Sequence, residues 1–308
     1  MNKHQFLATI ILSFAVLFTA CKKEGVYNPK EKISKIYHQF SNDSVTGDIG
    51  LIEKWTWDGN KLSRIDYLDE GCYETFEYKG SQIIGVSGNN KGSFYYIAFI
   101  YGDKSLLQKI DYYVGGELGS TVDITYNNDK ISQMKIKVGE NLYYSSKSMD
   151  QINGLSHIIR FIVSEQLAER MQQQIQKAES SYTIISFEYE GNNIKTETWT
   201  NSESADSKTV YTYVYDTKKN PFYHALSYNF GSFMCLSENN ITGITKTMIY
   251  ATFSTIEKTE YNYTYEGDFP SQRDYKHFVK TEVFNPETFE NETRNVYIFT
   301  ESLHYEYK

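Results

Sequence analysis

The sequence predicts a mainly β fold: an antiparallel sheet of repeated hairpins, curved as far as a half-barrel, with one long inserted helix near residues 155–178. Three observations lead to this prediction, namely an aromatic-rich composition, a repeated turn pattern and one amphipathic stretch. The chain has 28 Tyr and 18 Phe but only 4 Pro. Aromatic residues favour a pleated, half-buried surface, and a Tyr ring can pack on a sheet while its hydroxyl reaches water.

A recurring pattern consists of an aromatic residue, two or three turn residues, and an aliphatic residue five positions after the aromatic. Turn residues such as Asp-Gly and Asn-Asn favour positive φ at a hairpin tip, and the flanks alternate as strands do. Each copy therefore predicts one hairpin. The copies begin at Trp57, Tyr78, Tyr101, Tyr126 and Tyr189, with degenerate ones at Tyr215, Leu236 and Tyr265.

Two of these copies must turn differently from the rest. The residues after Tyr215 and Tyr265 begin like the other turns but continue into Pro221 and Pro270. Proline lacks the N–H that a regular ladder needs. We therefore expect irregular turns at these two positions.

After the fourth copy the hairpin repeats are interrupted by a segment whose apolar residues have helical spacing. Apolar residues from Leu155 to Ile175 recur at helical spacing, which is typical of an amphipathic helix. We expect this helix, within an insertion at 152–180, to pack on the concave face of the sheet. Its cationic residues are too few to favour a membrane-binding helix.

The N-terminus has the features of a bacterial export signal. Lys3 precedes an uncharged run at residues 6–18, which has the length of a signal-peptide core and is too short to span a membrane as a helix. The tetrapeptide that ends at Cys21 resembles the bacterial lipobox, with Phe18 where Leu is usual. We therefore expect Cys21 to be lipidated.

This signal implies a domain organisation and a location. Residues 1–20 are the predicted signal peptide, 21–32 a tether, and 33–308 a single domain. Acyl chains on the N-terminus would anchor the domain to a membrane of the cell envelope, and we expect the outer membrane, on its periplasmic or surface face. The net charge of -8 argues against a nucleic-acid partner, and the oligomeric state is left open.

Several segments resemble known families. Tyr215-Asp216 and the stretch from Trp57 to Leu62 resemble the YD repeats of RHS-type β-structures. The segments 215–222, 237–241 and 263–270 resemble a group of uncharacterised Gram-negative, Bacteroides-type lipoproteins with Tyr-Asp turns, an Asn-Pro-Phe segment and an Asn-Asn-Ile step. This resemblance covers most of the mature chain. It implies an antiparallel β fold and carries no assigned chemistry.

Motif searches identify no reaction, so no catalytic residue, metal or cofactor is predicted. The six histidines lack the spacing of a metal site, and no nucleophile motif is present. Carboxylate pairs such as Asp69 with Glu70, or Glu238 with Glu260, are compatible with glycoside hydrolysis. A hydrolase with dispersed catalytic residues therefore stays a minor alternative.

Ser44 is a candidate for O-glycosylation, and Cys72 and Cys235 are candidates for a disulfide bond. Ser44 lies in Asp-Ser-Val, which resembles an O-glycosylation pattern of exported Gram-negative proteins. Cys72 and Cys235 lack flanks typical of redox or metal sites, which favours two free thiols. A disulfide between them stays open, because disulfides persist outside the cytoplasm.

The main functional hypothesis is a non-catalytic binding module for a glycan, lipid or peptide. Tryptophan rings stack on sugars and line apolar pockets, which makes Trp55, Trp57 and Trp199 the candidate ligand-binding residues. Because Trp55 and Trp57 share parity, they lie on one face of a strand, and this face is either a binding face or the core. The alternative is a structural or assembly scaffold of the envelope.

Overall fold

The structure is a computed structural model that describes residues 26–42, 45–69, 71–90, 92–138, 182–202, 204–225, 234–250, 254–285 and 290–308. Within these ranges the chain forms strands and two 3-10 turns, Asp103–Ser105 and Met234–Leu236. None of the described segments forms a helix long and apolar enough to cross a membrane. The predicted helix at 155–178 and its insertion at 152–180 lie outside the described residues.

Seventeen strands follow one another along the described chain, and every pairing between them is antiparallel. Their bounds are β1 Ile33–Asn42, β2 Val45–Thr46, β3 Gly50–Asp58, β4 Lys61–Tyr67, β5 Cys72–Lys79, β6 Gln82–Asn90, β7 Ser93–Tyr101, β8 Leu107–Val114, β9 Glu117–Asn127, β10 Lys130–Val138, β11 Tyr182–Glu190, β12 Asn193–Asn201, β13 Ser204–Lys219, β14 Asn239–Ile249, β15 Ser254–Glu266, β16 Phe269–Asn285 and β17 Glu290–Tyr307.

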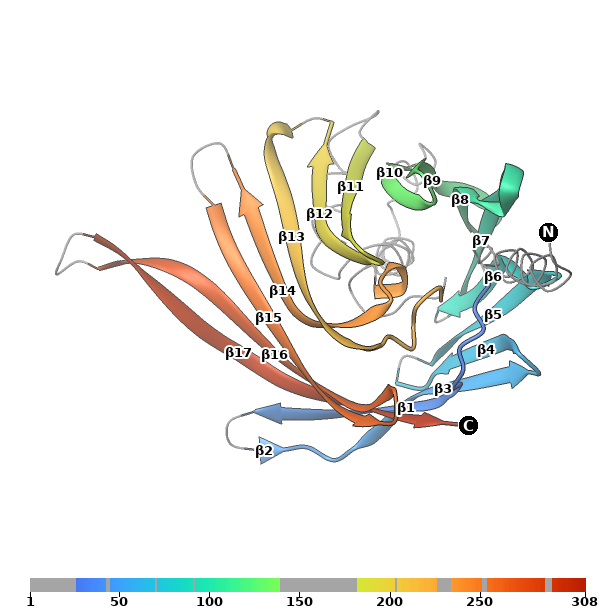
Figure 1. The fold of residues 1–308 in the computed structure, drawn as a ribbon, viewed down its shortest axis with the longest axis horizontal. Coiled ribbons are helices and arrows are strands. Elements are labelled where there is room, and N and C mark those ends of the chain that lie inside the picture. The colour runs from blue at the N-terminus through green and yellow to red at the C-terminus, as the bar shows by residue number, and fades with distance from the viewer. Residues whose placement is uncertain are drawn as a thin grey trace, which may run out of the picture.

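The sheet closes on itself, so the prediction of a half-barrel is wrong. Each strand pairs with the next, and β17 then pairs with β1 through rungs such as Tyr305 with Ile36. β1 also pairs with β3, while the short β2 only extends the ladder of β1. The result is a closed barrel of 16 strands, in which the last strand runs beside the first (Figure 1). Closure satisfies the backbone groups that an open sheet would leave at its two edges.

The repeated sequence pattern is the signature of a bulged hairpin. In four copies the aromatic and the aliphatic five positions later are cross-strand partners, as in Trp57 with Leu62 and Tyr78 with Ile83. A register shift falls next to the aromatic in all four of these copies. Gly59 at the first tip has a φ of 55°, which an L side chain rarely adopts.

Five aromatics of the repeated pattern, together with Tyr263 and Tyr307 outside it, connect one hairpin to the preceding one. The hydroxyl of Tyr78 donates to the carbonyl of Leu62 at 2.8 Å, and that of Tyr101 donates to Ile83 at 2.6 Å. We call this contact the hairpin latch. Its members in the described chain are Trp57 to Ile33, Tyr78 to Leu62, Tyr101 to Ile83, Tyr126 to Leu107, Tyr215 to Ile194, Tyr263 to Ile241 and Tyr307 to Pro270.

Contacts across the barrel identify its inner face. Phe222 follows β13, yet its ring lies 6.3 Å from that of Trp55 on β3 and 6.0 Å from that of Tyr305 on β17, measured between centroids. Since β14 to β17 and β1 separate β13 from β3 around the wall, this contact passes through the interior. Trp55 and Tyr305 therefore point inward, and alternation along the strands places Lys54 and Thr56 outside.

The inner face is mainly apolar and buried, and the chain segments before β1 and after β13 pack against it at the end that carries the hairpin latches. Tyr27 is 3% exposed, lies 5.6 Å from Trp57 between ring centroids, and donates its hydroxyl to the carbonyl of Pro221 at 2.9 Å. Phe222 and Ala225 are buried in the same cluster. The chain segment before β1 and the segment after β13 thus fill this end of the barrel.

The outer face is mainly polar along the middle of the strands, with exposed apolar side chains at Phe94, Ile100 and Val214. On most strands the charged and hydroxyl side chains are exposed, whereas the side chains between them are buried. This pattern is the reverse of a membrane-spanning barrel, whose lipid-facing side chains are apolar. Exposed outward residues include Lys54, Thr56, Glu77, Thr125, Glu188, Lys195, Thr200, Thr212, Lys258, Glu260 and Asn262.

Candidate ligand-binding site

The three predicted tryptophans lie inside the barrel and are hydrogen-bonded. Trp55 and Trp57 do share a face, with ring centroids 6.4 Å apart, and that face belongs to the core. The indole of Trp55 donates to Glu53 at 2.7 Å, that of Trp57 donates to the carbonyl of Ile33 at 2.7 Å, and that of Trp199 donates to Glu197. All three are less than a tenth exposed, and a role in ligand binding stays a prediction.

Buried carboxylates are a feature that the sequence analysis missed. Glu53, Glu74 and Glu197 are each less than 5% exposed on the inner face. Glu74 accepts hydrogen bonds from the hydroxyls of Tyr67 at 2.9 Å and Tyr95 at 2.8 Å. The spacing Glu-x-Trp, which occurs on β3 and again on β12, is the signal that predicts two of these sites, because residues two apart share a strand face.

Glu197 is the most strongly perturbed of these groups for which a value is resolved. It receives hydrogen bonds from Trp199 and, at 2.6 Å, from the hydroxyl of Tyr213. Burial raises the pKa of its carboxyl from 4.5 to about 7, although both hydrogen bonds act in the opposite direction. A carboxyl with this pKa can gain or lose a proton near neutral pH, but its burial keeps it away from any dissolved ligand.

The part of the wall that opens toward solvent lies between β14 and β15. Their ladder ends at the rung between Gly243 and Glu260, while β15 continues to pair with β16 as far as Glu266. On the other side, β13 bulges twice against β14 after Val214. We call the resulting gap the wall slot.

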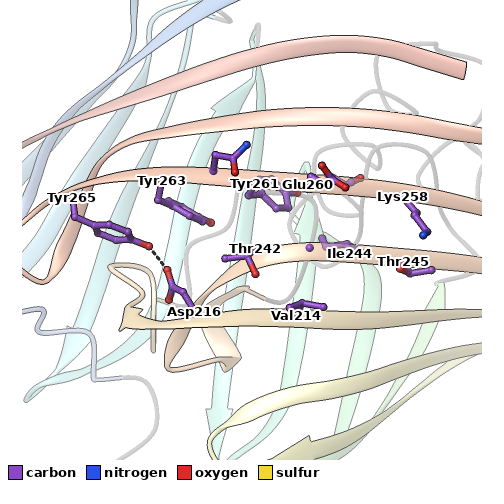
Figure 2. Close-up of a pocket in the computed structure, with 13 residues that line it drawn as sticks. Val214, Asp216, Thr242, Ile244, Thr245, Lys258, Glu260, Tyr261, Tyr263 and Tyr265 are labelled. Carbon is purple, nitrogen blue, oxygen red and sulfur yellow. Dashed lines mark hydrogen bonds between the residues drawn. The ribbon is translucent and has the colours of Figure 1, made fainter. Parts of the chain in front are cut away.

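The wall slot is a pocket of about 560 Å³, within the size range of small-molecule sites. Figure 2 shows its side chains along β13, β14 and β15. Val214, Glu260 and the side-chain-free Gly243 occupy one row across the three strands. The full lining is Val214, Asp216, Thr242, Gly243, Ile244, Thr245, Lys258, Thr259, Glu260, Tyr261, Asn262, Tyr263 and Tyr265.

Two tyrosines of β15 cross the wall slot. The hydroxyl of Tyr263 reaches the carbonyl of Ile241 at 2.8 Å, and that of Tyr265 donates to the carboxylate of Asp216 (Figure 2). Their rings are stacked at 28° with centroids 5.8 Å apart. Burial raises the pKa of Tyr265 well above its ordinary value, so its hydroxyl stays a donor to Asp216.

The two copies that run into a proline both contribute to the slot. Asp216 belongs to the Tyr215 copy, where β13 bulges twice against β14. Tyr265 belongs to the other copy, and there the expectation of an irregular turn is wrong: Tyr265 pairs with Pro270 five positions later, with a register shift next to Tyr265, as in the other hairpins. Asn240 donates to the Tyr265 hydroxyl at 3.3 Å, and Asp216 accepts from the backbone N–H of Lys218 at 2.9 Å. These contacts position the slot residues.

The remaining candidate residues offer little chemistry. Cys72 and Cys235 are both free thiols, and burial raises the pKa of the Cys235 thiol to about 12, so it is a poor nucleophile at neutral pH. Within the described ranges, His, Cys, Asp and Glu side chains form no group of three that could hold a metal. Cys21, Ser44 and Glu70 lie outside the described residues.

Comparisons with known proteins give structural neighbours only. The fold is similar to that of a porin-like protein from Bacteroides uniformis, with 13% sequence identity, a TM-score of 0.48, and coverage of 92% of this chain and 100% of that one. A porin-like protein from Bacteroides vulgatus has 10% identity, a TM-score of 0.47, and coverage of 91% and 99%. No family model matches the chain, and no curated protein does. Because the sequence identities and TM-scores of these neighbours are low, the function of this protein is inferred from the residues of its own barrel.

The expected relationship to YD or RHS-like repeat lipoproteins is wrong. The hairpins do not form an open repeat sheet but close into one barrel through the pairing of β17 with β1. The Tyr-Asp and Trp-Asp-Gly-Asn turns misled because any bulged antiparallel hairpin favours such residues, whatever the larger architecture.

Proposed function

We propose that this protein is a non-catalytic binding protein of the bacterial cell envelope, tethered by lipid at Cys21, whose barrel stands in water beside the membrane. The observation that supports this most is the polarity of the wall. A porin of this strand number holds an aqueous channel and exposes apolar residues to lipid. Here most outward residues are polar, with Phe94, Ile100 and Val214 as exposed exceptions, and most inward residues are buried.

Lysines on the outer face would be costly in a membrane. Lys54 and Lys258 point outward along the middle of their strands, and each Lys at the midplane of a membrane would cost roughly 2–4 kcal/mol. In water these lysine side chains are solvated, so their exposure carries no such free-energy cost. The wall slot supports the binding role, because it offers a recess with aromatic, hydroxyl and charged groups.

Fractionation of a Gram-negative host tests this proposal. The full chain should stay with membranes through a high-salt wash and be released by detergent. A variant in which a cleavable, non-lipoprotein signal replaces residues 1–21 should be recovered from the periplasm without detergent. If this variant still needs detergent, the barrel spans the membrane and the proposal is wrong.

One observation favours a scaffold as the second candidate. The ladder between β16 and β17 continues beyond Lys280, where β15 stops pairing, and beyond Thr300, where β1 does, so this hairpin projects as an arm (Figure 1). Cross-linking in cells tests it: a scaffold predicts one discrete partner that is lost when residues 281–294 are removed.

A further inference from the structure

The chemistry of the wall slot identifies a ligand class. We propose that the slot binds a neutral glycan, with a sugar ring placed against Tyr265 and its hydroxyls bonded to the polar groups around it. This inference rests on the proposed function, since the slot meets soluble ligands only if the wall faces water.

The charges of the slot exclude the common anionic ligands. Asp216 and Glu260 bring two carboxylates against the single ammonium of Lys258. A phosphate or an anionic lipid headgroup needs an excess of cationic donors, and this balance would repel it. A neutral, polar ligand is therefore favoured.

Donors and acceptors in the slot match alcohols. A sugar hydroxyl both donates and accepts a hydrogen bond, so it needs both kinds of partner. The Asp216 and Glu260 carboxylates accept, the Lys258 ammonium donates, and the Asn262 amide does both. Glu260, Asn262 and Lys258 are exposed, so they are accessible to a ligand.

The aromatic part of the slot supplies a flat apolar surface. Tyr265 is held by its hydroxyl bond to Asp216 and by its stacking on Tyr263. Tyr rings offer a rigid, amphipathic contact of the kind that suits the apolar face of a sugar. The stacked pair provides this surface beside the Asp216 carboxylate, and Glu260 and Asn262 line the same slot farther along β15.

Matched tyrosines allow a sharp test. Tyr189 occupies the corresponding position of the hairpin β11–β12, with the ammonium of Lys130 5.2 Å from its ring centroid, as that of Lys218 is 5.7 Å from the ring centroid of Tyr265. Tyr265→Ala and Tyr189→Ala should therefore disturb the barrel to a similar degree. Only the first removes a slot ring. Tyr265→Phe keeps the ring and loses the hydroxyl.

The measurement is calorimetric titration of the detergent-purified, lipidated full chain with neutral oligosaccharides, namely glucans, mannans, xylans, galactans and chitin fragments. We expect saturable binding that weakens at least tenfold in Tyr265→Ala and in the double variant Glu260→Ala with Asn262→Ala. Tyr189→Ala, Glu188→Ala and Tyr265→Phe should keep it within about threefold.

Several results would overturn the glycan assignment. These are no saturable binding of any of these sugars, equal losses in Tyr265→Ala and Tyr189→Ala, or binding of phosphatidylglycerol vesicles in their place. Each of them leaves the fractionation result intact. If the variant without the lipid still needs detergent for its release, the proposed function is wrong. The sugar titration measures the glycan assignment independently of that result.

Discussion

Glu197 shows how one buried side chain can set the pH response of the whole barrel. Its carboxyl is enclosed with the indole of Trp199 and the hydroxyl of Tyr213, and burial raises its pKa to about 7. In the unfolded chain the same group titrates near 4.5. Between these values the folded state binds more protons than the unfolded state.

The stability of the protein should therefore fall as the pH rises through 7. The contribution of Glu197 is fully present below pH 4.5 and is lost above about pH 7, which corresponds to roughly 2–3 kcal/mol between pH 5 and pH 8. Glu197→Gln should show a correspondingly smaller change. Urea unfolding followed by tryptophan fluorescence at both pH values measures this, and an equal pH dependence in both proteins would show that Glu197 does not titrate as described.

Gly88 is a second residue whose role follows from its neighbours. It lies on β6 between Glu74 and Tyr95 in the register, and the Tyr95 side chain crosses above it to reach Glu74. A Cβ at this position would lie 2.0 Å from the Tyr95 ring. Glycine is therefore required for the hydrogen bond between the ring and the carboxylate.

Gly88→Ala should push Tyr95 away from Glu74 and destabilise the barrel by about 1–3 kcal/mol. Gly50→Ala is the control, because a Cβ there meets nothing within 4 Å. Chemical denaturation of both variants gives the comparison. Equal stability of the two would mean that Tyr95 can relax without cost.

At the scale of elements, the hairpin latch explains why each repeat needs an aromatic with a polar tip. The bulge next to the aromatic and the turn after it fix the cross-strand partner, and the hydroxyl then reaches back to the previous hairpin. A buried carbonyl without a partner is costly. The latch thus stabilises neighbouring hairpins against each other at one end of the barrel.

Removing single latches should give similar, moderate losses. Tyr101→Phe and Tyr126→Phe delete hydroxyls that donate to Ile83 and Leu107 at 2.6 and 2.8 Å, and each should lower the free energy of unfolding by about 1 kcal/mol. Tyr96→Phe, whose hydroxyl contacts Glu77 at the surface, should change it by less than about 0.5 kcal/mol. Thermal and urea unfolding distinguish these cases. A loss in Tyr96→Phe as large as in the others would contradict the latch.

For the whole molecule, the described chain begins at the packed end of the barrel. Tyr27 is buried at the latch end, beside the turn where Lys32 contacts Gly59 and Asn60 at 2.8 Å. Cys21 precedes Tyr27 by six residues, which reach roughly 20 Å when extended. A lipid on Cys21 therefore implies that the latch end faces the membrane.

This orientation is measurable with two labels at opposite ends of one strand. Asp129 follows β9 at the latch end, and Glu117 begins β9 roughly 35 Å away. Fluorophores on Asp129→Cys and Glu117→Cys in the lipidated, liposome-bound protein should differ, with headgroup quenchers acting mainly on the former. Equal or reversed quenching would show another orientation.

The wall slot belongs to this scale as well. It forms where three strands stop pairing regularly, and its residues come from β13, β14 and β15. No single hairpin contains it. Its side chains meet because the Tyr215 and Tyr265 copies lie on strands two apart in the closed barrel.

The sequence by itself determined the local structure of this protein. Alternation and turn residues predicted antiparallel hairpins, and the structure has such a hairpin at the first copy, where Trp57 pairs with Leu62. The sequence also predicted that Trp55 and Trp57 share a face, because side-chain direction has a period of two residues. These features depend on residues close in the chain, so the sequence carries them directly.

Three features follow only from the tertiary structure: the sheet closes into a barrel, Trp55 and Trp57 point into its interior, and the wall slot lies between β14 and β15. An open and a closed sheet have the same alternation, so the rungs that join β1 to β17, about 270 residues apart, leave no local pattern. Parity groups Trp55 with Trp57 but does not say that their side is the interior, which the contact of Phe222 across the barrel established. The slot likewise depends on where ladders between distant strands end, and that is set by how the whole ring closes.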